Sequence, residues 1–210
     1  LKRCNLSGIH MDSLQLLQNL TLLDLASNQL SDFAIDALPK SIRELDLSCN
    51  KIQTLCKDCN ESVTIPNLIK LNVSHNNLSR LPIKCPSLQT LDCGHNCISE
   101  ISQEFLNSTS RSLTTLDARE NSIKTCLNLS KCTSLKVVVL AHNQLTEPPI
   151  IHTNLAQLIL SENKLSSLEG LFQDDSTEHS QLVALHSRDN RLDTLDSEVV
   201  QRLLHIRLLD

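Results

Sequence analysis

The chain has 210 residues, of which 42 are leucine and 17 are asparagine, and its formal net charge is −5 at pH 7. It has no tryptophan or tyrosine and only three phenylalanines, so it offers no aromatic platform for single-stranded nucleic acid and no aromatic cage for a cation. Because it also lacks a basic stripe and an apolar run of about 20 residues, we expect neither a nucleic-acid partner nor membrane insertion.

Leucine and asparagine recur in register along the chain. Eight segments fit the pattern L-x-x-L-x-L-x-x-N-x-L, and we call them rungs 1 to 8 and number the positions within each from one to eleven. Rung 1 spans 20–30, and rung 8 spans 182–192. The asparagines at position nine are Asn28, Asn50, Asn76, Asn96, Asn121, Asn143, Asn163 and Asn190.

Each rung predicts a short strand followed by a turn. Its L-x-L stretch has a period of two residues, so both apolar side chains face the same side of a strand. The asparagine follows where the chain turns away, and its buried amide can bond to the backbones of its own and the neighbouring rung. Stacked rungs therefore form a parallel sheet on one side and variable connections on the other, with an asparagine ladder between them.

These residues resemble the leucine-rich-repeat superfamily, and the resemblance covers essentially the whole chain. It implies an α/β fold, a leucine-rich-repeat solenoid curved like a horseshoe. The parallel sheet would line the concave face, and short helices, 3₁₀ turns and extended segments would form the convex side. The resemblance also implies protein–protein recognition, mainly through the concave face.

The connections differ in length, from 20 residues between Asn76 and Asn96 to 27 between Asn163 and Asn190. Prolines in the shorter connections favour extended or 3₁₀ geometry. Longer connections leave room for helical turns, which we expect at 36–40, 103–107 and 197–204, the last with Ser197 as its N-cap. We expect Phe105 and Phe172 to fill the convex-side core, and the acidic segment 174–179 to form a solvated loop.

Both ends match only part of a rung. Residues 1–6 fit the second half, with Cys4 at the asparagine position, and 206–210 fit the first five positions. Neither end resembles the polar or cysteine-rich cap that covers a terminal rung. We therefore expect a single leucine-rich-repeat domain over 1–210, with eight full repeats and partial repeats at both ends, taken from a longer solenoid.

The nine cysteines are scattered and odd in number. The C-x-x-C motif of Cys56 and Cys59 has no second pair at zinc-site spacing, and Cys93 is expected to point into the core while His95 lies outside. We therefore expect no metal and no cofactor. Reduced cysteines and irregular repeat lengths favour a cytoplasmic location. Seven Asn-x-Ser/Thr triplets leave an extracellular location open, at Asn5, Asn19, Asn60, Asn72, Asn77, Asn107 and Asn128.

No catalytic constellation stands out. Ser74 and His75, with Asp46 or Asp92, could suggest a hydrolase triad, but Ser-His-Asn recurs because the repeat recurs. The chain has no glycine-rich phosphate loop and no H-E-x-x-H motif. We expect no catalytic residues and no enzymatic activity in this segment.

Position five forms a continuous column along the predicted sheet. It is acidic in the first rungs, and we leave open whether this acidic column is functional or only the commonest form of the motif. The column becomes apolar in rungs 6 and 7. In order, its residues are Asp24, Asp46, Asn72, Asp92, Asp117, Val139, Ile159 and His186.

An apolar patch on an otherwise polar sheet indicates a contact surface, either for a partner or for another part of the same protein. We predict a protein partner, bound by an interaction module of a cytoplasmic regulatory or scaffolding protein. The first alternative is the recognition arm of a multidomain signalling enzyme (kinase, GTPase or ligase) with catalysis elsewhere, and the second is a receptor ectodomain. The predicted partner-binding residues are Lys136, Val137, Val139, Gln157, Ile159, Val183 and His186.

Overall fold

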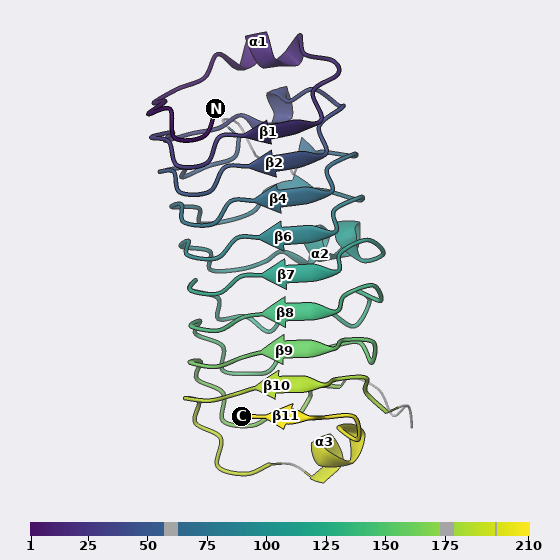
Figure 1. Cartoon of the computed structure of the whole chain (residues 1–210). Coiled ribbons are helices and arrows are strands. Elements are labelled where there is room, and N and C mark those ends of the chain that lie inside the picture. The colour runs from purple at the N-terminus through teal and green to yellow at the C-terminus, as the bar shows by residue number, and fades with distance from the viewer. Residues whose placement is uncertain (57–62, 173–178, 196) are drawn as a thin grey trace.

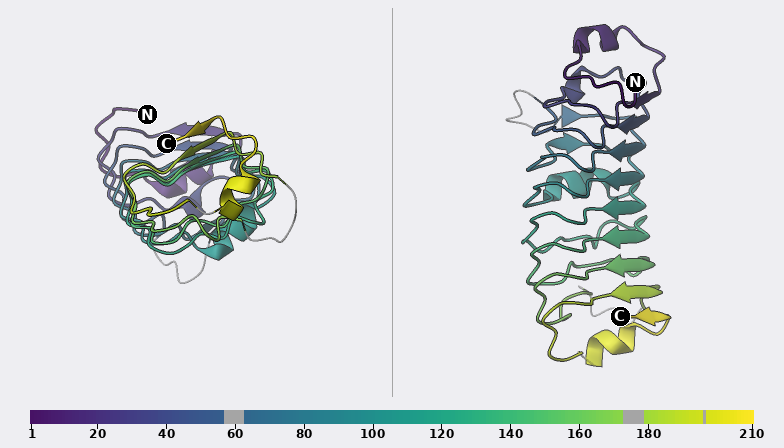
Figure 2. Two further views of the ribbon diagram at one scale, coloured as in Figure 1. Left: turned by 90° about the horizontal axis from the view of Figure 1, so that it is seen from below. Right: turned by 60° about the vertical axis from the view of Figure 1, so that its left-hand side comes forward.

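The computed structural model describes residues 1–56, 63–172, 179–195 and 197–210. The chain forms a leucine-rich-repeat solenoid, in which successive turns stack and place their strands side by side (Figure 1). Nine strands form one parallel sheet in the order β1-β2-β4-β6-β7-β8-β9-β10-β11. Seen from the side, the strands occupy one edge of the column and α2 lies on the opposite side (Figure 2).

The strands of this sheet are very short and pair without any shift in register. Position four of each rung lies beside position four of the next, as in Leu45 beside Leu71. Because the register is constant, each of these side chains points into the same core, and Leu71, Leu91 and Leu116 are fully buried. The strands are β1 (Leu22–Asp24), β2 (Glu44–Asp46), β4 (Lys70–Asn72), β6 (Thr90–Asp92), β7 (Thr115–Asp117), β8 (Val137–Val139), β9 (Gln157–Ile159), β10 (Ala184–His186) and β11 (Leu208–Leu209).

The connections carry the remaining elements. Two extended segments, β3 (Val63–Thr64) and β5 (Ile83–Lys84), pair as a small parallel sheet. The helices are α1 (Met11–Gln15), the 3₁₀ turn η1 (Ile35–Ala37), α2 (Gln103–Thr109) and α3 (Ser197–Arg202). Of the helices in the described residues, none is both long and apolar enough to cross a membrane.

Two of the three helix predictions need correction. The helix expected at 36–40 is only the 3₁₀ turn η1, because Pro39 disfavours the helical conformation at Leu38. Ser197 is the first residue of α3 rather than its cap, and the preceding residue lies outside the described ranges. The helix at 103–107 is confirmed and continues to Thr109. The hydroxyl of Ser102 caps it by accepting a hydrogen bond from the Phe105 N–H at 3.2 Å.

The phenylalanines are core residues to different degrees. Phe105 is fully buried on the convex side. Phe172 is half-buried, with the guanidinium carbon of Arg202 4.7 Å from the centre of its ring. The acidic segment predicted as a solvated loop falls almost entirely in 173–178, outside the described residues.

The asparagine ladder is confirmed at all eight rungs, and each amide joins two turns of the solenoid. In rung 3, the Asn76 amide donates to the carbonyl of Leu47 in the preceding rung and to that of Val73 in its own, at 3.0 and 3.1 Å. Its oxygen accepts from the Ile52 N–H at 2.9 Å. One buried side chain thus satisfies backbone groups that the turn would otherwise leave unpaired.

The residue before each ladder asparagine adopts a left-handed conformation. The backbone angle φ is between 50° and 57° at all eight of these positions, none of which is glycine. Asparagine, aspartate and histidine tolerate this region best, whereas bulky residues are strained there. The eight residues define one rim of the solenoid, which we call the turn rim: Ser27, Cys49, His75, His95, Glu120, His142, Glu162 and Asp189.

Replacing one ladder asparagine tests how much these bonds contribute. We expect Asn76→Ala to lower the free energy of unfolding by about 1–3 kcal/mol, because buried backbone groups of two rungs lose their partners. The matched control is Gln29→Ala, directly after the ladder residue of rung 1. Gln29 is exposed and its side chain makes no hydrogen bond within the described residues, so its removal is expected to be nearly neutral. Urea denaturation measures both variants, and equal losses would contradict the proposed role of the ladder.

Candidate functional site

The sheet presents alternate side chains outward, and this outward set forms the sheet face. Position four of each strand is buried, while positions three and five on either side of it are mostly half-buried, as in β7. Constant register places every position-five side chain next to that of the neighbouring rung, about 4.8 Å away. The column predicted from the sequence is therefore present, and its side chains change from acidic to apolar along the solenoid in the order that the sequence gives.

The acidic half of the column has a local structural role. Each carboxylate accepts a hydrogen bond from the backbone N–H two residues later, which fastens the turn that follows the strand. Asn72 does the same with its amide oxygen. The donor and acceptor pairs are Ala26 and Asp24, Ser48 and Asp46, Ser74 and Asn72, Gly94 and Asp92, and Arg119 and Asp117, at 2.9–3.1 Å. These bonds favour the interpretation of the acidic column as part of the repeat motif.

The negative charge of the column is also partly neutralised where Asp92 and Asp117 lie side by side. The guanidinium of Arg119 forms two parallel contacts with the carboxylate of Asp117, one of them at 3.0 Å from Nε to Oδ1. Burial raises the pKa of Asp92, and the neighbouring charge of Asp117 adds to this rise. The Gly94 N–H, Arg119 and His75 oppose it. Asp92 therefore carries its charge at a cost to the folded state.

The structure brings the seven predicted partner-binding residues together on three adjacent rungs. Val137 pairs with Gln157, and Val139 pairs with Ile159, whose other neighbour is His186. Lys136 and Val183 immediately precede β8 and β10. We call this set the β8–β10 patch. Its role in binding a partner stays a prediction.

One residue of the patch contributes little accessible surface. Val139 lies on the sheet face as expected, but it is only 6% exposed. In a parallel sheet the side chains of Asp117 and Ile159 lie on either side of Val139 at strand spacing, and together they shield it from solvent. The accessible apolar surface of the patch belongs instead to Val183, which is 39% exposed, and to the half-buried Val137 and Ile159.

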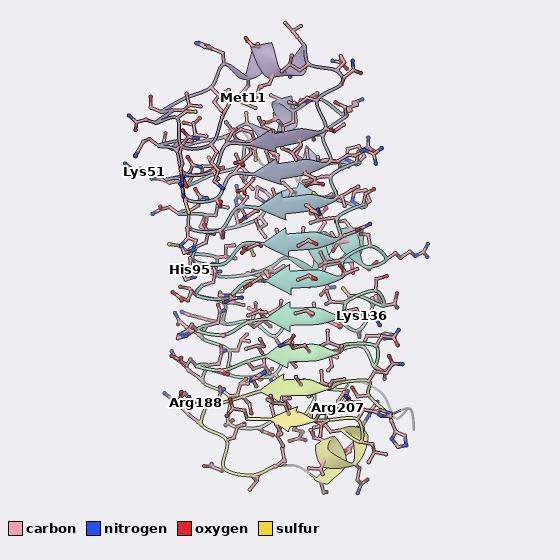
Figure 3. The ribbon with its side chains drawn as sticks, in the orientation of Figure 1. Met11, Lys51, His95, Lys136, Arg188 and Arg207 are labelled. Carbon is pink, nitrogen blue, oxygen red and sulfur yellow. The ribbon has the colours of Figure 1, made fainter. Side chains whose placement is uncertain are left out.

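Polar groups border the patch at both edges of the sheet. Lys136 lies at the edge where the strands begin (Figure 3), and its ammonium donates to the carbonyl of Asn154 at 3.1 Å. Arg207 lies at the same edge, on the last turn. At the other edge, His186 Nδ1 is 3.7 Å from a carboxylate oxygen of Asp210.

A hollow of about 490 Å³ adjoins the patch at Val183, and the sequence analysis missed it. It forms where β11 stacks on β10 and brings residues 204–207 against rung 8. Extending the rung numbering past Ile206 would have placed Arg207 beside Val183, at position two. The hollow is lined by Gln181, Val183, Leu204, His205, Ile206 and Arg207.

The turn rim carries a second group of polar side chains. The rings of His75 and His95 stack with their centres 4.0 Å apart. His95 also lies 3.0 Å from a carboxylate oxygen of Glu120, and His142 lies 2.9 Å from one of Glu162. Within the described ranges, no three histidine, cysteine, aspartate or glutamate side chains are placed to hold one metal ion.

The serine and histidine that could suggest a hydrolase triad make other contacts in the structure. Ser74 is buried and its hydroxyl donates to the amide oxygen of Asn72 at 2.7 Å. His75 faces His95 across the turn rim. The Ser74 hydroxyl therefore has a partner that cannot act as a general base.

The cysteines divide into buried and exposed thiols. Cys93 is fully buried while His95 lies on the turn rim, so these two side chains diverge as expected. Burial raises the pKa of Cys85 to about 12 and that of Cys132 to about 11, which keeps both thiols protonated at neutral pH. Seven of the cysteines in the described ranges are free. The expectation of fully reduced cysteines is wrong for Cys56, which is disulfide-bonded; the other residues of its C-x-x-C motif lie outside the described ranges.

The raised pKa of Asp92 predicts a pH-dependent cost. Above the pKa of the unfolded chain the charge destabilises the fold, and this cost fades as the pH falls through the raised pKa. We therefore expect Asp92→Asn to raise stability at neutral pH, with an advantage that shrinks toward about pH 4. An asparagine retains the acceptor for the Gly94 N–H, as Asn72 shows in its own rung. Urea denaturation across this range checks the effect, and a less stable variant at neutral pH would contradict it.

Similarity to known proteins agrees with the geometry. A model described as "Leucine Rich repeats (2 copies)" matches residues 66–108, and one described as "Leucine Rich repeat" matches 17–38 and 39–54. The chain is 34% identical to bovine osteomodulin over 133 residues, which cover 60% of this chain and 31% of osteomodulin. It is 36% identical to human Toll-like receptor 6 over 105 residues, which cover 49% of this chain and 13% of the receptor.

Among solved structures, the chain resembles one in "Octameric complex of Latrophilin 3 (Lec, Olf), Unc5D (Ig, Ig2, TSP1) and FLRT2 (LRR)", with a TM-score of 0.66 and 25% identity. The match covers 93% of this chain and 68% of that one. The chain spans less than a third of the length of osteomodulin or of Toll-like receptor 6. With the eight-rung ladder, the constant strand register and these similarities, the chain belongs to the leucine-rich-repeat superfamily.

Proposed function

We propose that this chain is a protein-recognition module that binds its partner through the β8–β10 patch. A leucine-rich-repeat solenoid supports such a role, because it offers a broad, rigid surface whose outward residues vary independently of the core. A similar chain is named as the leucine-rich-repeat component of a multiprotein complex.

One observation carries the choice of the patch. In the rungs with aspartate or asparagine at position five, that side chain accepts a hydrogen bond from the N–H two residues later. Val139 and Ile159 cannot accept one, and in the described chain the N–H groups of Ala141 and Ser161 have no protein acceptor. Natural sequences depart from a locally consistent pattern mainly at functional sites. Rungs 6 and 7 therefore lack a turn hydrogen bond that each of the first five rungs makes.

The surroundings indicate the chemistry of the partner. The exposed apolar surface of Val183 continues into the hollow formed with Leu204 and Ile206. Lys136 and Arg207 lie at the edge where the strands begin (Figure 3), and Arg207 lines the hollow. An apolar side chain seated at the hollow, with a carboxylate on the side of these two cations, would complement both features. The partner segment is therefore proposed to be apolar with an acidic flank.

We propose no catalytic role for this chain, since Ser74 and the described histidines form no nucleophile–base pair. Catalysis in another part of a longer protein, as in the recognition arm of a signalling enzyme, would be compatible with the same patch. A nucleic-acid partner is disfavoured by the net charge of −5 and by the scarcity of aromatic residues.

For the setting, we favour a receptor ectodomain over the cytoplasmic regulator expected from the sequence. One of the similar proteins is named as a receptor. The disulfide at Cys56 is typical of an oxidising compartment. The seven free thiols favour the cytoplasmic alternative.

The patch is tested by a double variant that keeps the fold. We expect Val139→Asn with Ile159→Asp to weaken partner binding by about tenfold or more, because a polar pair replaces buried apolar contacts. Both new side chains supply the acceptor that the other rungs use, so the free energy of unfolding should stay within about 1 kcal/mol. Ile159→Asp is chosen because asparagine there would create a new Asn-Leu-Ser triplet with Leu160 and Ser161.

The measurement is capture of proteins from cell-surface extract by the full-length protein, followed by affinity measurement on the purified partner. The matched control is Asp24→Asn, which changes the sheet face far from the patch and keeps the acceptor for the Ala26 N–H. We expect the control to bind like the wild type. Equal capture by the double variant and the control would contradict the proposed binding site.

The setting is tested by counting thiols in the denatured protein before and after reduction. If the disulfide at Cys56 forms in the native protein, fewer than nine thiols react before reduction and nine react after it. Nine reactive thiols in the protein isolated without reductant would count against the extracellular setting.

A further inference from the structure

We infer that the chain carries N-linked glycans on its flanks, at Asn5, Asn19, Asn77 and Asn107, and that its sheet face is bare of them. This inference rests on the proposed extracellular setting. The observation behind it is that the structure sorts the Asn-x-Ser/Thr triplets into two groups. Six of the seven begin at a described asparagine, and the triplet at Asn60 lies outside the described ranges.

In the first group the asparagine side chain is exposed. Asn5, Asn19 and Asn77 are exposed, as are the hydroxyl residues that complete their triplets, and within the described structure none of these three amides is hydrogen-bonded. Asn107 is exposed on α2, where its oxygen accepts from Gln103 at 3.1 Å and its amide nitrogen stays free. Each of these nitrogens has room for a bulky, hydrated substituent.

The four exposed asparagines share a second property, which is that none lies on a strand of the large sheet. Asn77 directly follows the ladder residue Asn76, and Asn5 occupies the same position ten in the first, partial rung. Asn19 precedes rung 1, and α2, which carries Asn107, lies on the side opposite the sheet (Figure 2). Glycans at these positions would extend from the flanks and the convex side.

In the second group the asparagine is half-buried and already bonded within its own triplet. The oxygen of Asn72 accepts from the Ser74 N–H at 3.0 Å and from the Ser74 hydroxyl at 2.7 Å. Asn128 makes the same pair of bonds to Ser130, at 3.1 and 2.6 Å. Asn72 also lies in β4 between Asp46 and Asp92, so a glycan there would stand over the sheet face.

The modification is a simple transfer. The amide nitrogen bonds to the first carbon of an oligosaccharide carried on a lipid diphosphate, the bond from that carbon to the diphosphate oxygen breaks, and the amide loses one proton. The secretory pathway supplies this lipid-linked donor, and no oxidation or reduction takes place. The consequence for the proposed function is steric, because glycans on the flanks leave the sheet side as the open route for a partner.

The test is to release the glycans enzymatically from the secreted full-length protein in heavy-oxygen water, which converts each modified asparagine to labelled aspartate. Peptide mass spectrometry then locates the label. We expect label at the four exposed asparagines and none at Asn72 or Asn128. Absence of label from the four, or label at Asn72 or Asn128, would overturn the inference.

Variants give an independent readout as steps in gel mobility before deglycosylation. Ser7→Ala, Thr21→Ala and Ser79→Ala each remove one triplet without touching its asparagine. Asn107→Gln is used for the fourth triplet, since the Thr109 hydroxyl is buried in α2. Each should lose one mobility step. The controls Asn72→Asp and Asn128→Asp keep the acceptor for the serine that follows, and a mobility step lost in either would overturn the inference.

The outcome is separable from that of the binding site. If the protein lacks glycans and the double variant still loses its partner, the glycan inference and the extracellular setting are contradicted and the binding site is supported. If the glycans are found as expected and the double variant binds like the wild type, the binding site is contradicted and the glycan inference is supported. Enzymatic removal of the glycans should leave the affinity for a purified partner unchanged, because the patch carries none; a loss of affinity would contradict a bare sheet face.

Discussion

The fold depends on one repeated interaction, the buried asparagine amide that bonds to two successive turns. In rung 3, Asn76 ties the carbonyl of Leu47 and the N–H of Ile52 in the preceding rung to the carbonyl of Val73 in its own. The amide fits only if the turn has the same shape in every rung. This requirement explains why the residue before each ladder asparagine is left-handed even where histidine, cysteine or glutamate occupies it.

A fixed turn has a second effect, because it also fixes the register of the strands. Position four always meets position four, so the core is filled by one layer of side chains per rung and aliphatic residues suffice. The same constancy lines up the outward residues. Surface chemistry therefore changes along the solenoid without any change in backbone, and a run of a few rungs presents a surface of its own.

The sequence predicted the features that repeat from rung to rung, but it predicted the features of single rungs less well. The ladder, the parallel sheet and the adjacency of Val139 and Ile159 follow from register alone. The local effect of Pro39 on η1 was missed, although Leu38-Pro39 is visible in the sequence. The burial of Val139 was missed because it depends on lateral packing between strands. The hollow beside Val183 was missed because the rung numbering was not extended to Arg207, and because Leu204 and His205, which also line it, lie outside the repeat pattern.

The change from aspartate to valine and isoleucine at position five is best understood by comparing magnitudes. A hydrogen bond to the turn N–H contributes about 0.5–1.5 kcal/mol net. Burying a valine or isoleucine side chain contributes about 1.5–3 kcal/mol when it is complete, and less at Ile159, which is only half-buried. The two contributions are of similar size, so position five accepts either kind of residue without loss of the fold. Stability therefore does not dictate the switch at rungs 6 and 7, which agrees with the proposal that those rungs present a binding surface.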